Sequence, residues 1–151
     1  MACPFFMPGE RFVGIGWQHR ARLPLGDGWQ GCCTAPGHEN IAPGPHELTE
    51  FCNLGYAKAC PRLPQKRAWD AIRFCVTRDR ENMIAVMYVC EANHHPREHG
   101  VLEYDSVLDK WVSTHRDVRI QKMVECYVQS YLSRRDDPAR IREAQSTKSH
   151  D

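Results

Sequence analysis

The sequence predicts an α+β fold, in which a segment rich in proline, glycine and cysteine packs on a small antiparallel sheet of three strands with one C-terminal helix. Three observations support this prediction. Most of the prolines and glycines fall in residues 1–65, where they oppose long regular elements and favour an irregular path. Residues 71–104 contain apolar runs typical of strands. Residues 120–132 carry apolar side chains at three- and four-residue steps, which indicates an amphipathic helix.

The predicted sheet begins with a β-hairpin. Residues 71–77 alternate between apolar and polar side chains, and residues 83–92 form a longer apolar run, so both are expected to be strands. Between them, residues 79–82 have the composition of a turn. The polar residues 93–100 are expected to be a loop that leads to a short third strand at residues 101–104.

The predicted helix has recognisable ends. Thr114 and Asp117 have the spacing of an N-terminal capping signal, and Arg134 and Arg135 suit the negative end of the helix dipole. Pro138 is expected to stop the helix. The chain therefore divides into a cysteine-rich metal-binding segment (1–65), a β-β-β-α layer (66–135) and a polar, flexible tail (136–151), forming one compact unit overall.

Composition narrows the possible partners. The net charge is +1 and 26% of the residues are charged, so the chain lacks the excess of basic residues that is typical of a nucleic-acid-binding protein. No apolar run approaches the roughly 18 residues that a membrane-spanning helix needs, so no membrane insertion is expected. The first eleven residues contain two prolines, with the charges after the apolar part, unlike a signal peptide. We therefore expect a cytoplasmic protein, in which cysteines favour metal or redox chemistry over disulfides.

Five of the eight cysteines lie in the first 65 residues, and none of them forms the C-x2–4-C pair typical of zinc sites. An iron–sulfur cluster offers separate iron corners to cysteines from separate loops. The sequence therefore favours a 4Fe-4S cluster, with zinc as the alternative metal. Buried, unligated cysteines and disulfides are further alternatives. The expected ligands are Cys3, Cys33, Cys52 and Cys60.

Cys32 is the alternative to Cys33 as a ligand. Adjacent residues rarely both reach one cluster, because their side chains diverge, and Gly31 two positions before Cys33 offers a hinge. The remaining cysteines, Cys75, Cys90 and Cys126, lie in predicted strands or beside the helix stripe, where a single cysteine is usually a packing residue.

Two of the expected ligands are followed by proline, in Cys3-Pro4 and Cys60-Pro61, as in the last cysteine of the bacterial ferredoxin run. Together with the segment from Cys52 to Pro64 and the sequence Leu-Pro-Leu-Gly-Asp at residues 23–27, these steps resemble small bacterial iron–sulfur proteins of unassigned role. The resemblance covers the first 65 residues. It implies cysteine ligands to a cluster and nothing about activity.

Residues 93–100 gather three histidines, His94, His95 and His99. One interpretation is a solvated loop, because connecting segments are polar by default. The other is that these histidines lie near the metal centre, where they supply a proton or a docking contact.

The sequence contains no phosphate-binding loop, dinucleotide fingerprint, nucleophile elbow or H-E-x-x-H motif, so a stand-alone enzyme is not favoured. The predicted function is an electron-transfer or redox module, or an accessory subunit of a larger redox protein or enzyme complex. Two alternatives remain: a structural zinc-binding adaptor for protein–protein contacts, and an iron–sulfur enzyme with an open iron site.

Overall fold

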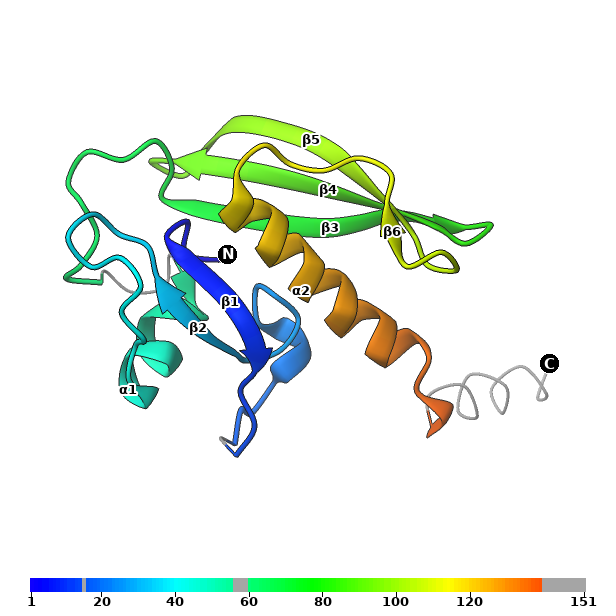
Figure 1. Ribbon diagram of the computed structural model, residues 1–151, viewed down its shortest axis with the longest axis horizontal. Coiled ribbons are helices and arrows are strands. Elements are labelled where there is room, and N and C mark those ends of the chain that lie inside the picture. The colour runs from blue at the N-terminus through cyan, green and yellow to red at the C-terminus, as the bar shows by residue number, and fades with distance from the viewer. Residues whose placement is uncertain (15, 56–59, 140–151) are drawn as a thin grey trace.

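The computed structural model describes residues 1–14, 16–55 and 60–139. It contains two antiparallel sheets, and the long helix α2 (Val118–Arg135) lies between them (Figure 1). The smaller sheet pairs β1 (Phe6–Arg11) with β2 (Trp29–Cys33). The larger sheet has the strand order β3 (Ala71–Arg80), β4 (Met83–Ala92), β5 (His95–Asp105) and β6 (Lys110–Trp111). The fold is α+β, but the predicted single sheet of three strands is wrong.

The larger sheet differs from the prediction mainly in its third strand. Asn93 and His94 both have positive φ, 50° and 63°, which closes β4 and β5 with a tight two-residue turn. The expected loop over residues 93–100 is therefore mostly strand, and His95 already pairs with Ala92. Polar composition misled the prediction because this part of β5 is held by backbone pairing while its side chains stay largely exposed. The fourth strand, β6, has only two residues, too few for a periodic pattern.

The predicted hairpin agrees better with the structure. Strand β4 covers residues 83–92 as expected, and β3 runs three residues beyond its predicted end. Glu81 and Asn82, with φ of 53° and 68°, form the turn between them. Helix α2 begins after Asp117, whose carboxylate accepts the N–H of Arg119 at 2.9 Å. Asp117 is therefore the N-cap residue. The prediction that Thr114 caps the helix, with Asp117 as the third residue after the cap, is wrong.

The N-terminal segment is also more regular than predicted. Besides β1 and β2 it contains a 3-10 turn, η1 (Arg20–Arg22), a short helix, α1 (Pro45–Glu47), and a π-helical turn, η2 (Leu48–Cys52). Its apolar side chains join those of the larger sheet and of α2 in one buried cluster, so the two parts share a core. This cluster contains Ala2, Phe6, Leu25, Trp29, Leu48, Ile72, Cys90, Ile120, Met123 and Cys126.

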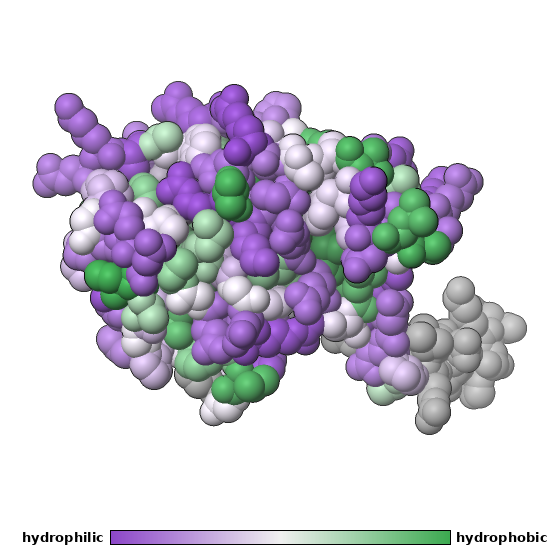
Figure 2. All heavy atoms as spheres, in the orientation of Figure 1, coloured by the Kyte–Doolittle hydropathy of each residue, from purple (hydrophilic) through white to green (hydrophobic). Residues whose placement is uncertain are grey.

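On the face seen in Figure 2, apolar side chains are scattered among polar ones and form no single large patch. Within the part of the chain that the structure describes, no helix has both the length and the apolar character to cross a membrane. Most of the predicted tail, residues 140–151, lies outside the described residues.

The N-terminus is fixed to the larger sheet by two backbone hydrogen bonds. Ala2 N–H donates to the Ile72 carbonyl at 2.7 Å, and Ile72 N–H donates back at 3.0 Å. Gly55 packs closely against this bridge with φ of +60°, and a Cβ at its position would lie 1.9 Å from the Met1 carbonyl oxygen. Because Cys3 follows Ala2 directly, this contact sets where the first cysteine lies.

Replacing Gly55 with alanine is therefore expected to strain the backbone and to push the N-terminus off β3. We expect the free energy of unfolding to fall by more than the roughly 1–2 kcal/mol that a positive φ alone costs. Gly37→Ala is the matched control, because Gly37 has φ of +82° but no atom within 4 Å of a Cβ. Urea unfolding of both variants measures the difference, and equal losses would contradict the steric role of Gly55.

Candidate metal centre

Four cysteines line one cavity at the end of the β1–β2 sheet. Cys3 precedes β1, Cys33 ends β2, Cys52 ends η2, and Cys60 follows the undescribed residues 56–59. They are the four predicted ligands, and they reach the cavity from four separate chain segments. The cysteines are free thiols, each partly exposed.

The adjacent cysteine, Cys32, does not line this cavity. On β2 it pairs with Met7, whereas Cys33 pairs with Phe6. Successive residues of a strand point to opposite faces, so only one of the two can face the cavity. The structure places Cys33 there.

A buried asparagine connects the segment that carries Cys33 to the segment that carries Cys52. The Asn53 side chain accepts the Trp29 N–H through Oδ1 at 2.9 Å and donates through Nδ2 to the Trp29 carbonyl at 2.8 Å. Nδ2 also donates to the Leu48 carbonyl at 3.0 Å. The Asn53 side chain therefore bonds both backbone groups of Trp29, as a neighbouring strand would, and connects the start of β2 to η2.

An ion pair fixes the segment after Cys60. Arg62 Nη2 lies 2.7 Å from Glu47 Oε1, and the other Glu47 oxygen accepts the Gly44 N–H at 2.8 Å. Both side chains are largely shielded from solvent, with 21% and 31% exposure. This pair connects α1 to the segment that begins at Cys60.

Apart from the four cysteines and the Glu47–Arg62 pair, the cavity wall is apolar. The volume of the cavity is about 30 Å³. That is room for one or two water molecules. Among the described residues, no group of three or more His, Cys, Asp or Glu side chains is arranged to hold a single metal ion. The four thiols therefore surround a small space without converging on one ion position. The apolar wall comprises Phe5, Phe6, Ala35, Pro43, Phe51 and Leu63.

A backbone N–H group is directed at the sulfur of Cys33. The Ala35 N–H donates to Cys33 Sγ, with 3.4 Å between N and S. Near Cys3, the Phe6 N–H donates to the Cys3 carbonyl at 3.2 Å, and the backbone N–H groups of Phe5 and Phe6 oppose the rise of the Cys3 pKa. Hydrogen bonds of this kind to cysteine sulfurs tune iron–sulfur centres.

Burial dominates the acidity of the thiols. It raises the pKa of Cys3 to about 11 and that of Cys52 to about 12, and the neighbouring cysteines add to both shifts. Without a cation these thiols are neutral at physiological pH. A bound metal would supply the positive charge that thiolates at such positions need.

The three histidines singled out in the sequence lie on the β4–β5 hairpin, where all are exposed. None lines the cysteine cavity. Of the remaining cysteines, Cys90 and Cys126 are buried in the shared core, and Cys75 is exposed on β3.

No sequence pattern predicts the residues that position the cysteines. Asn53, Glu47 and Arg62 carry no motif in the sequence, since their partners are backbone groups or lie far away along the chain. Their only sequence signal is proximity to expected ligands, because Asn53 follows Cys52 directly and Arg62 lies two residues after Cys60.

Comparison with known proteins gave no match to any family model, to any curated protein or to any solved structure.

The Asn53 contacts predict a specific sensitivity. Asn53→Asp keeps the shape but removes both Nδ2 hydrogens, leaving two buried carbonyls without that donor and placing a carboxylate in the core. We expect the free energy of unfolding to fall by about 2–4 kcal/mol. The control is Gln65→Glu, the same change from amide to carboxylate at an exposed position with an ordinary backbone conformation, which should alter it by less than about 0.5 kcal/mol. Chemical denaturation followed by tryptophan fluorescence tests this, and similar losses in the two variants would refute the proposed role of Asn53.

Proposed function

We propose that Cys3, Cys33, Cys52 and Cys60 hold an iron–sulfur cluster of the 4Fe-4S type, and that the protein acts as an electron-transfer or redox module of a larger redox protein or enzyme complex. The observation that carries the proposal is the meeting of these four cysteines at one cavity. They come from positions dispersed over nearly sixty residues, and each is a free thiol.

A cluster explains the arrangement better than zinc does. Structural zinc sites are usually built from C-x2–4-C pairs, in which one tight turn presents two thiolates to the ion, and the four cysteines come from four separate segments with no such pair. A cluster takes its cysteines at separate iron corners. The backbone N–H of Ala35, which donates to Cys33 Sγ, also suits a sulfur that carries negative charge when bound to iron.

Because the cavity is small, a cluster can enter it only if the cavity walls move. A four-iron cluster is much larger than the one or two water molecules for which the cavity has room, so we expect the cysteine-bearing segments to separate when it is incorporated. The Glu47–Arg62 ion pair lies at the wall of the cavity and joins two of these segments. We expect cluster incorporation to shift the two segments apart and to change this contact.

An electron-transfer role is favoured over an enzyme with an open iron. Four cysteines would occupy all four iron corners and leave none for substrate. The same cysteines are each partly exposed, so the cluster would lie close to the surface, where a docked partner can exchange electrons with it.

The adjacent cysteines of β2 provide a matched test. Protein purified without oxygen should be brown and contain about four iron and four sulfide per chain. We expect Cys33→Ser to lose most of this iron and the visible absorption, while Cys32→Ser keeps both, because only Cys33 faces the cavity. Iron, sulfide and zinc analysis with visible spectroscopy measures the effect.

Two results would contradict the proposal. Colourless protein with about one zinc per chain and no sulfide would instead support the structural zinc adaptor. Equal loss of iron from Cys32→Ser and Cys33→Ser would mean that the cavity is not where the cluster binds.

A further inference from the structure

A second pocket lies at the other end of the β1–β2 sheet. Phe6 pairs with Cys33 at the cysteine cavity, and Arg11 pairs with Trp29 five residues along β1. At about 3.3 Å per residue the two ends are about 17 Å apart. We call the second site the arginine pocket. It is defined by Arg11, Arg20, Arg22, Arg134 and Asp27.

The arginine pocket has a strong positive charge. Four guanidinium groups line it, and Asp27 is the only carboxylate among the lining residues. Asp27 lies 3.5 Å from both Arg11 and Arg20, and it also accepts the Gly28 N–H at 2.7 Å. Within the described part of the chain, Arg22 and Arg134 have no carboxylate partner. The pocket therefore holds an excess of three positive charges in a chain whose net charge is only +1.

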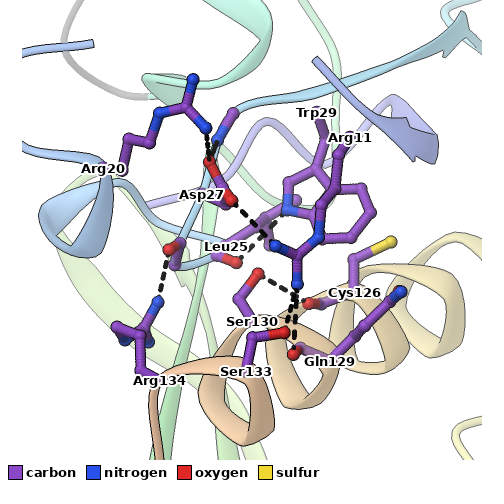
Figure 3. Close-up of polar contacts among 12 residues, drawn as sticks. Arg11, Arg20, Leu25, Asp27, Trp29, Cys126, Gln129, Ser130, Ser133 and Arg134 are labelled. Carbon is purple, nitrogen blue, oxygen red and sulfur yellow. Dashed lines mark hydrogen bonds and ion pairs between the residues drawn. The ribbon is translucent and has the colours of Figure 1, made fainter. Parts of the chain in front are cut away.

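Two of these arginines are held in place before any ligand arrives (Figure 3). Arg11 donates to Ser133 Oγ and to the Gln129 carbonyl on α2, and its guanidinium lies 5.7 Å from the centre of the Trp29 ring. Arg134 donates from α2 to the Gly26 carbonyl. Each guanidinium has five N–H donors, so these contacts leave donors of both groups for an anion.

A glycine lets the loop before β2 approach α2 at this pocket. Gly26 has φ of +73°, and a Cβ there would lie 2.9 Å from Ser130 Cβ and 3.0 Å from Arg134 Nη2. The resulting pocket has a volume of about 390 Å³, within the roughly 300–1,000 Å³ of small-molecule sites. It is much larger than a single water or chloride site requires.

We propose that the arginine pocket binds the phosphate group of a phosphorylated small molecule. Arginine forks match the oxygens of phosphate in pairs, and four arginines around one concave site, two of them held in place, suit a group with two negative charges. The pocket is local and concave, which favours a small molecule over an extended nucleic acid. This site involves none of the cysteines, so the proposal does not depend on the metal centre.

Pyrophosphate is a suitable probe, and isothermal titration calorimetry of the full chain at low salt measures its binding. We expect saturable binding of one pyrophosphate per chain that weakens at least tenfold in Arg22→Gln. Arg22 is exposed and unpaired within the described residues, so its replacement should leave the fold intact, and an unchanged melting temperature checks this.

The control variant is Arg116→Gln. It removes the same charge from a side chain that is 80% exposed, pairs with Glu98 and lies outside the pocket, so binding should change less than twofold. Absence of saturable pyrophosphate binding would overturn the proposal, as would equal weakening in both variants. A short oligonucleotide that binds through Arg22 while pyrophosphate does not would assign the pocket to nucleic acid and also overturn it.

Discussion

The buried side chain of Asn53 ties together the two segments that carry Cys33 and Cys52. It satisfies both backbone groups of Trp29, which burial would otherwise leave unpaired at a cost of about 1–3 kcal/mol each. It also adds a second donor to the Leu48 carbonyl, which the Asn53 backbone N–H already bonds. Trp29 is almost fully buried and is the largest side chain of the shared core. Through this contact, the position of the cysteines depends on the packing of the same core that holds the two sheets on α2.

The β1–β2 sheet has a candidate site at each of its two ends. Its Cys33 end closes the cysteine cavity, and its Arg11 end forms the arginine pocket against α2. Helix α2 also reaches towards the cysteine end, since the Arg119 guanidinium lies 5.3 Å from the centre of the Phe5 ring. One helix therefore contacts the surroundings of both sites.

Local patterns in the sequence predicted the elements that local patterns determine. The alternation and apolar run of residues 71–92 gave the β3–β4 hairpin, and the stripe from Ile120 gave α2. The early part of β5 was missed because polar side chains cover a strand that is held by backbone pairing with β4. The β1–β2 sheet was missed because its paired residues lie far apart along the chain. Cysteine type and spacing led to the four thiols that meet at the cavity, but Asn53, Glu47 and Arg62 act through partners that no spacing reveals. The metal itself stays a prediction.

The most direct test of the account is the anomalous scattering of crystals grown without oxygen, recorded on both sides of the iron and zinc absorption edges. We expect a strong iron signal inside the cysteine cavity, within bonding distance of the sulfurs of Cys3, Cys33, Cys52 and Cys60, with the cavity walls moved apart. A signal at the zinc edge alone, or an iron signal that one of these four sulfurs does not contact, would contradict it.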